Sequence, residues 1–338
     1  MAKDIAIDLG TANTRIYLRG KGLVVDEPTA IAINTKQDRV VAVGREAAVM
    51  YGRVPQNISV IMPVNGGVVG DFDAAARMVQ EFIKMAMAQS YFGRPVARLG
   101  FRRGMTEVEE MALKELAEAS GIKKHELLSS VAASAVGINL KIVAATACMV
   151  ADLGAGVSEV AVFSMGDITA SGMIRCAGNA LTDAIIPHIK KEYGVLIGRG
   201  MAEEVKMTIG SALPKVQDEY MEVRGRDLYT GLPKNIQVSS EEIREAMDDT
   251  VKQIVGLIKK VLEQLPPEQL SDILDDGIYL TGGTALLNGL DRRIALDTGV
   301  SVTVAESPTS SVIAGLGRCI DNETVRRQPA FYNRSVGI

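Results

Sequence analysis

The chain has 338 residues, of which 47% are hydrophobic and 23% charged, enough apolar material for two compact lobes. Its formal net charge of -4 and its lack of tryptophan argue against nucleic acid as a partner, because that partner needs a basic face or aromatic stacking surfaces. No apolar run is long enough to span a bilayer and no apolar signal segment opens the chain, so a cytoplasmic protein is expected.

Two segments resemble each other and divide the chain into halves. Residues 7–18 read IDLGTANTRIYL and residues 151–162 read ADLGAGVSEVAV, with Asp-Leu-Gly at the same place in both. Each segment predicts an apolar strand, a glycine-bearing turn and a second strand, which together form a β-hairpin. Strands then alternate with helix-period segments, so each half is predicted to be an α/β lobe.

Two capping boxes predict where helices begin. Residues 106–109, TEVE, open a helix that Gly121 ends, and residues 239–242, SSEE, open another that continues to Leu262. The apolar positions that recur at helical spacing in the first of these helices are Val108, Met111, Ala112 and Leu116.

Two further segments are interpreted from their composition. Residues 141–150, KIVAATACMV, are short and apolar and are expected to form a buried strand that enters the second lobe. The polar tail from Asp321 contains Pro329 and is expected to be loosely held at the surface.

The glycine turns of the two hairpins are candidate phosphate sites, because a glycine backbone can approach an anion closely and bind it through N–H groups. The residues in question are Gly10, Thr11, Ala12 and Asn13 in the first turn and Gly154, Ala155 and Gly156 in the second. Either segment alone is equally typical of an ordinary turn. The duplication favours the phosphate-binding interpretation.

Asp8 and Asp152 precede these turns and would repel phosphates unless a divalent cation lay between, so hydrated Mg²⁺ near both aspartates is expected. A third glycine segment, GIYLTGGTALLNGL from Gly277, predicts a strand, a Thr-Gly-Gly turn and a helix. The N-terminus of that helix could receive an anion or the edge of a nucleotide. Any α/β protein can contain such a turn, so this segment alone is weak evidence for a nucleotide site. It is stronger evidence together with the two other glycine turns.

Taken in order, these segments resemble the superfamily of actins, sugar kinases and DnaK-type chaperones, and within it the bacterial actins of the MreB family. The similarity extends to about Arg318 and includes IDLGTANTRIYLRGKGLVVDEPTAIAI, AEEVKMTIGSA, MEVRGRDLYTGLPK and VAESPTSSVIAGLGR. It implies an actin-like fold, with two duplicated lobes, mixed sheets flanked by helices, and a nucleotide cleft between the lobes. It also implies a first lobe at 1–145, with a small subdomain near 33–70, and a second lobe at 146–318, with a subdomain near 181–245. The tail at 319–338 is expected to pack on the first lobe or to be flexible.

The resemblance implies a protein that binds ATP or ADP with Mg²⁺, with GTP as an alternative, and forms head-to-tail filaments. Such filaments lie on the inner face of the cytoplasmic membrane and guide cell-wall synthesis with elongation proteins. Glu203 and Lys206 match positions that contact ribose and base, although a solvated helix pair has the same spacing. Gly282, Gly283 and Thr284 match the adenosine turn.

The chain departs from the MreB pattern at groups that position the attacking water. Val157 stands where the family has a hydroxyl, and Ser130 stands where it has a glutamate. Because phosphoryl transfer depends on positioning, slow or absent hydrolysis with retained nucleotide binding is expected. Arg102 and Arg103 replace a proline-serine pair at a strand end near the cleft, where they could bind phosphates or carboxylates.

Tyr91 and Phe92, followed by several arginines, suit an anionic membrane surface, with burial in the core as the alternative. A small-molecule kinase of the same superfamily is the second candidate function, but it would need a carboxylate aimed at a substrate hydroxyl, and no such motif is found.

Overall fold

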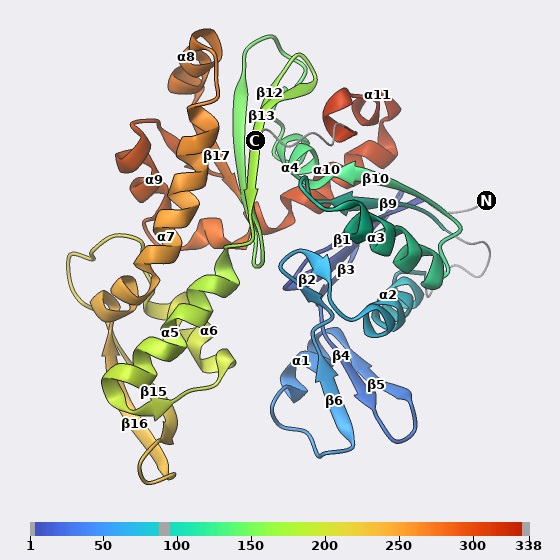
Figure 1. Cartoon of the computed structure of the whole chain (residues 1–338). Coiled ribbons are helices and arrows are strands. Elements are labelled where there is room, and N and C mark those ends of the chain that lie inside the picture. The colour runs from blue at the N-terminus through green and yellow to red at the C-terminus, as the bar shows by residue number, and fades with distance from the viewer. Residues whose placement is uncertain (1–3, 88–94, 333–338) are drawn as a thin grey trace.

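The computed structural model describes residues 4–87 and 95–332, which form two α/β lobes with one five-stranded mixed sheet each (Figure 1). The first sheet has the order β10-β9-β1-β2-β3, and the second has the order β13-β12-β11-β17-β18. In each sheet the central strand pairs antiparallel with the next strand of its hairpin and parallel with a strand from later in the chain. The predicted duplication and the α/β fold class are confirmed.

The strands of the first sheet are β1 (Asp4–Leu9), β2 (Asn13–Leu18), β3 (Gly22–Pro28), β9 (Val96–Phe101) and β10 (Lys124–Ser129). Those of the second sheet are β11 (Cys148–Leu153), β12 (Ser158–Ser164), β13 (Asp167–Ile174), β17 (Ile278–Thr281) and β18 (Val302–Val304). The smaller sheets consist of β4 (Ile31–Asn34), β5 (Arg39–Val43) and β6 (Ile58–Ile61); β7 (Val64–Asn65) and β8 (Val68–Val69); and β14 (Val195–Leu196), β15 (Tyr220–Asp227) and β16 (Pro233–Ser239).

The helices of the first lobe are α1 (Gly44–Met50), α2 (Phe72–Met87), α3 (Glu107–Ala119) and α4 (Ser130–Gly137). The second lobe contributes α5 (Gly178–Tyr193), α6 (Arg199–Ile209), α7 (Ser240–Leu262), α8 (Pro267–Asp276) and α9 (Leu290–Thr298). The chain then forms α10 (Ser311–Asp321) and α11 (Glu323–Arg326), and the short 3-10 helices are η1 (Gly283–Leu286), η2 (Pro308–Ser310) and η3 (Pro329–Phe331).

Successive side chains of the central strands point to opposite faces of each sheet and so belong to different layers of the hydrophobic core. Ile5 and Ile7 of β1 pack in the core that contains α2 and α3, whereas Ala6 packs in a central core with α4 and α10. On β11, Val150 belongs to that same central core. Because side chains alternate between the two faces of a strand, Asp8 and Asp152 share the face of Ala6 and Val150, toward the middle of the molecule.

Helices α4 and α10 lie between the two large sheets, and the small sheets β4–β6 and β15–β16 lie at the lower end of the view (Figure 1). Gly315 of α10 and Gly137 of α4 make this helix crossing very close. A Cβ atom on Gly315 would lie 1.8 Å from the carbonyl oxygen of Ala133, and one on Gly137 would lie 1.9 Å from that of Ser311. Only glycine fits at these two positions.

Both predicted capping boxes are present, with Thr106 and Ser239 as the N-caps of α3 and α7. The predicted apolar face of α3 is confirmed at Leu116 and wrong at Val108 and Met111, because the helix buries Leu113, Leu116 and Ala117. Val108 and Met111 are 76% and 57% exposed, since they are turned away from that face. The helix is nearly half charged, and its few apolar residues fit more than one helical stripe.

The predicted strand at residues 141–150 is wrong for its first seven residues, because β11 begins only at Cys148. The backbone of the preceding segment pairs instead with the turn between β12 and β13: the N–H of Met165 donates to the carbonyl of Ala144, and that of Gly166 to Ile142. The third glycine segment also differs, because the one-turn 3-10 helix η1 follows its Thr-Gly-Gly turn and α9 starts only at Leu290.

The expectation of a loosely held tail is wrong as far as the tail is described. Phe331 is fully buried in the central core, and the N–H of Ala330 donates to the carbonyl of Gly166. Glu126 of β10 pairs with Arg326 at 2.9 Å and accepts a hydrogen bond from the hydroxyl of Tyr332 at 2.8 Å. One large aromatic side chain thus anchors a segment whose composition is otherwise polar.

Candidate functional site

The two duplicated hairpins end in turns with the same geometry. In the first, the N–H of Gly10 donates to the carbonyl of Asn13 at 3.1 Å; in the second, the N–H of Gly154 donates to the carbonyl of Val157 at 2.9 Å. A Cβ atom on Gly10 would lie 2.6 Å from the Asn13 oxygen, so the first turn requires glycine. Each turn therefore places its next N–H groups where they can face an anion.

A threonine from elsewhere in the chain holds each turn. The hydroxyl of Thr29 donates to the carbonyl of Gly10 at 2.7 Å, and that of Thr284 donates to the carbonyl of Gly154 at 2.6 Å. Thr284, expected in the adenosine turn, thus fixes the second phosphate turn. The duplication extends to these supporting contacts, which the sequence analysis did not identify.

The sequence-predicted glycine residues meet at one cavity between the lobes. Its lining includes Asp8, Gly10, Thr11, Ala12, Asn13, Arg102, Asp152, Gly154, Ala155, Gly156, Val157, Gly282 and Gly283. Gly282 has a φ of +81°, and a Cβ atom there would lie 2.2 Å from the carbonyl oxygen of Leu153, so the third turn can pack on the end of β11 only as glycine. Three turns from distant parts of the sequence form one pocket.

The turn between β7 and β8 closes this pocket, and the sequence analysis missed it. The N–H of Gly67 donates to the hydroxyl of Thr11 at 3.0 Å. A Cβ atom on Gly156 would lie 2.5 Å from that hydroxyl and 3.0 Å from the Cα of Gly66, so the two lobes touch here. The Asn-Gly pair at Asn65 and Gly66 is a turn signal that could have identified this contact.

Glu203 and Lys206 lie on α6 and are not among the residues that line the cavity. Lys206 Nζ lies 2.8 Å from Glu203 Oε2 and also donates to the carbonyl of Gly178 and the hydroxyl of Thr182, both at 3.0 Å. The side chain of Lys206 is only 13% exposed. The pair therefore fastens α6 to the start of α5 and is more than a solvated ion pair.

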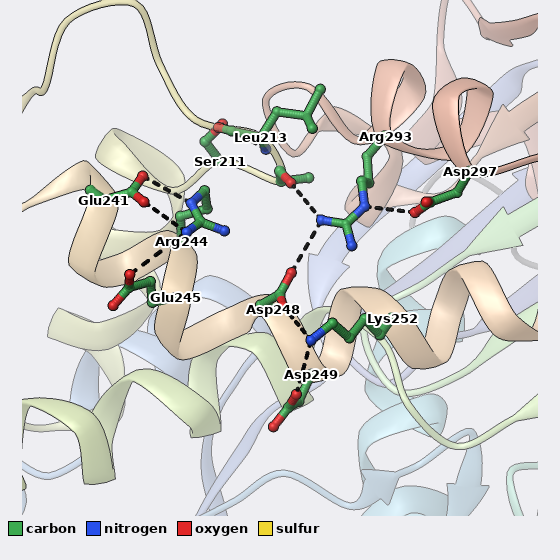
Figure 2. A network of polar contacts seen from close by, with 11 residues as sticks. Ser211, Leu213, Glu241, Arg244, Glu245, Asp248, Asp249, Lys252, Arg293 and Asp297 are labelled. Carbon is green, nitrogen blue, oxygen red and sulfur yellow. Dashed lines mark hydrogen bonds and ion pairs between the residues drawn. The ribbon is translucent and has the colours of Figure 1, made fainter.

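A polar network holds the segment that follows α6 (Figure 2). Arg293 of α9 pairs with Asp297 at 2.7 Å and with Asp248 of α7 at 3.1 Å, and it also donates to the carbonyl of Ala212 at 3.4 Å. The N–H of Ala212 in turn donates to the carbonyl of Asn288, just before α9. These contacts fix α6 relative to α9 and to the third glycine turn that precedes it.

The guanidinium of Arg102 binds the carboxylate of Asp152, which lines the cavity, and both Arg102 and Arg103 approach the buried carboxylate of Glu159. Nη1 of Arg102 lies 2.6 Å from Oδ2 of Asp152 and 3.9 Å from Oε2 of Glu159. The N–H of Arg103 donates to Oε1 of Glu159 at 3.0 Å. Glu159 lies opposite Asp152 in the β11–β12 hairpin, and two facing acids on paired strands are a sequence signal for a nearby cation.

Burial and charge shift the pKa values of this cluster. Burial raises the pKa of Asp8 above its ordinary value, although Arg102 and Arg15 oppose the shift. Burial also raises the pKa of Glu159 to about 7, against the opposing charge of Arg102. Burial acts to lower the pKa of Arg102, but Asp152, Asp8 and Glu159 raise it above its ordinary value. Arg102 therefore keeps its charge.

Asp8 and Asp152 do not fit Mg²⁺ as long as Arg102 holds Asp152. Magnesium requires oxygen ligands in near-octahedral geometry, and an ion bound directly to Oδ2 of Asp152 would displace the guanidinium that lies 2.6 Å from that oxygen. Over residues 4–87 and 95–332, no cluster of three or more histidine, cysteine or acidic side chains could hold a metal ion. Among the described side chains, the guanidinium of Arg102 is the positive charge paired directly with Asp152.

Comparison with known proteins identifies the family. The family model described as MreB/Mbl protein matches residues 2–328. The chain belongs to the MreB/Mbl family. It is 42% identical to cell shape-determining protein Mbl of Bacillus subtilis over 95% of this chain and 96% of that protein. It is also 42% identical to cell shape-determining protein MreB of Escherichia coli, over 95% and 94% of the two chains.

Solved structures confirm the actin-like fold. MreB5 of Spiroplasma citri bound to ADP is 32% identical and superposes with a TM-score of 0.89 over 97% of this chain and 98% of that one. The same protein has been solved with AMPPNP. The MamK double helical filament, at 17% identity and a TM-score of 0.80 over 95% and 99% of the two chains, shares the fold.

Within this MreB/Mbl fold, Ser130 and Val157 each lie beside the turn at Gly67. Ser130 is the first residue of α4 and borders a small cavity with Asp8, Gly67 and Arg102. Val157 packs against Gly67, where a Cβ atom would lie 2.6 Å from its Cγ2. Position 130 therefore offers no carboxylate and position 157 no hydroxyl.

Tyr91 and Phe92, the residues predicted to contact a membrane, lie outside the described residues. In the part of the chain that the structure describes, no helix is both long and apolar enough to cross a bilayer.

Proposed function

We propose that this MreB/Mbl chain binds an adenine nucleotide, ATP or ADP, between its glycine turns. The observation that carries the proposal is that Gly10–Asn13, residues 154–156 and Gly282–Gly283 all line one cavity. Backbone N–H groups at such turns suit phosphate oxygens. MreB5 of Spiroplasma citri, solved with ADP and with AMPPNP, supports an adenine nucleotide over GTP.

With nucleotide bound, the chain assembles head to tail into filaments that determine cell shape. The Bacillus subtilis and Escherichia coli relatives are named cell shape-determining proteins, and MamK forms a double helical filament. A repeated head-to-tail contact that does not close into a ring gives an open filament. The filament lies on the inner face of the cytoplasmic membrane and guides cell-wall synthesis through elongation proteins.

Electron microscopy of the purified chain with ATP tests the filament function. Filaments that form with ATP and are absent without nucleotide support it. Monomers that release ADP only when a small hydroxyl compound is added would instead establish the kinase alternative. The family match across residues 2–328 favours the filament.

Membrane binding depends on Tyr91 and Phe92, since aromatic tips beside arginines insert into an anionic interface. Replacing both by serine is expected to abolish co-sedimentation with liposomes that contain anionic lipid. Tyr229→Ser with Leu232→Ser is the matched control, because these side chains are also apolar, and 92% and 65% exposed, but they lie beside β15 and β16. Unchanged binding of the first variant would show that Tyr91 and Phe92 are structural.

A further inference from the structure

Arg102 joins the two lobes at the floor of the cavity. It follows β9 directly, and β9 runs parallel to β1, so Arg102 and Asp8 lie at the same edge of the first sheet. Its guanidinium reaches Asp152 of the second sheet at 2.6 Å. The two side chains are 17% and 3% exposed, so this ion pair is largely removed from water.

The registers of the two hairpins show why a cation is needed at this point. Asp8 lies opposite Arg15 in the first hairpin, so that hairpin supplies its own positive charge. Asp152 lies opposite Glu159 in the second, and Glu159 is fully buried. Two buried acids side by side require a positive charge from outside their hairpin, and Arg102 supplies it.

We propose that Arg102 takes the place of a divalent cation at the nucleotide site, so that this chain binds nucleoside di- and triphosphates without magnesium. This role depends on the nucleotide site proposed above. Arg102 lines the same cavity as the phosphate turns, and a guanidinium has five N–H donors in a planar arrangement that suits phosphate oxygens. Its pair with Asp152 occupies Nη1.

The same geometry disfavours magnesium at Asp152, because Arg102 already occupies Oδ2. A divalent ion bound at Oδ2 would have to break the pair with Arg102, and one held through Oδ1 or water would still lie beside a buried guanidinium. Magnesium also gives up its water reluctantly, whereas the backbone of β9 already positions Arg102. One fixed side chain therefore neutralises the acids that would otherwise repel a phosphate.

Isothermal titration calorimetry tests whether Arg102 replaces magnesium. The nucleotide-depleted full chain is titrated with ADP, once in excess magnesium and once in excess EDTA. For the wild type we expect the two Kd values to differ by less than about threefold. A Kd that is about tenfold or more weaker in EDTA overturns the role of Arg102, and the absence of binding in both buffers overturns the nucleotide site itself.

Arg102→Ala is expected to make ADP binding depend on magnesium, with a Kd about tenfold weaker in EDTA. The reason is that the guanidinium no longer competes with magnesium for Asp152. Arg102→Lys retains the charge but not the planar donors, so its loss of affinity in EDTA is expected to fall between those of the wild type and Arg102→Ala. Arg175→Ala is the matched control: Arg175 also bridges the lobes, at 2.5 Å from Glu109, but contacts neither aspartate. Magnesium-independent binding by Arg102→Ala would contradict the assignment.

A second measurement needs no variant that might fold poorly. Electron paramagnetic resonance of Mn²⁺ with ADP is expected to show a free-ion signal that stays the same or rises when the wild-type chain is added, because the chain takes up ADP without the ion. A signal from protein-bound Mn²⁺ that requires both ADP and the protein would overturn the role of Arg102.

Discussion

Replacing Ser130 by glutamate together with Val157 by threonine is expected to raise phosphate release from ATP by about a hundredfold or more over a slow wild type. The two substitutions restore the carboxylate and the hydroxyl that the MreB pattern has at these positions. Ser130 borders a small cavity with Gly67 and Arg102, so a glutamate there would have a positive partner once neighbouring side chains adjust to its size. Release of phosphate from purified filaments measures the effect.

Two matched variants test whether the faster hydrolysis comes from orientation of the attacking water or from changes in side-chain packing. Ser130→Gln with Val157→Thr has nearly the same shape but lacks the negative charge, and it is expected to remain slow. Ser130→Glu alone is expected to gain less than the pair, because groups that act together are not additive. The hypothesis of degraded hydrolysis fails if the wild type already turns over ATP as fast as the restored pair.

Gly315→Ala is expected to lower the apparent melting temperature by about 5 °C or more. The new methyl group would lie 1.8 Å from the carbonyl oxygen of Ala133, so α10 must move away from α4. Strain of this kind in a packed core typically costs about 1–3 kcal/mol, and a contact as short as 1.8 Å places this substitution at the upper end. Thermal unfolding followed by circular dichroism measures it.

Gly256→Ala is the matched control, because Gly256 lies within α7 and a Cβ atom there meets nothing within 4 Å. This substitution is expected to leave the melting temperature unchanged or to raise it slightly, since alanine stabilises a helix by about 0.5–1 kcal/mol over glycine. Equal losses from both substitutions would contradict the close crossing of α4 and α10.

The sequence was most informative where a pattern repeats. The two Asp-Leu-Gly segments predicted two hairpins, and strand alternation alone places Asp8 and Asp152 on the inner faces of their sheets, with Ala6 and Val150. The glycine turns could be predicted as well, because the backbone at Gly10 and Gly282 leaves no room for a side chain. At these positions the residue type alone indicates the local backbone geometry.

Other features depend on contacts between distant residues, which local patterns do not encode. Arg102 has two reasonable partners from sequence, phosphate or carboxylate, and only the folded arrangement brings it to Asp152 and Glu159. The face of α3 was wrongly predicted because Val108 and Met111 are apolar but exposed. The loosely held alternative for the tail was wrong because the polar composition conceals the buried anchor Phe331, whereas the contacts with Glu126 agree with a tail that packs on the first lobe.

The most direct test of the proposed site is an experimental structure of the chain with AMPPNP. We expect the phosphates to lie within hydrogen-bonding distance of the N–H groups of residues 10–13 and 154–156. A nucleotide bound elsewhere on the molecule, or a cleft left empty at saturating AMPPNP, would contradict the assignment of this cavity as the nucleotide site.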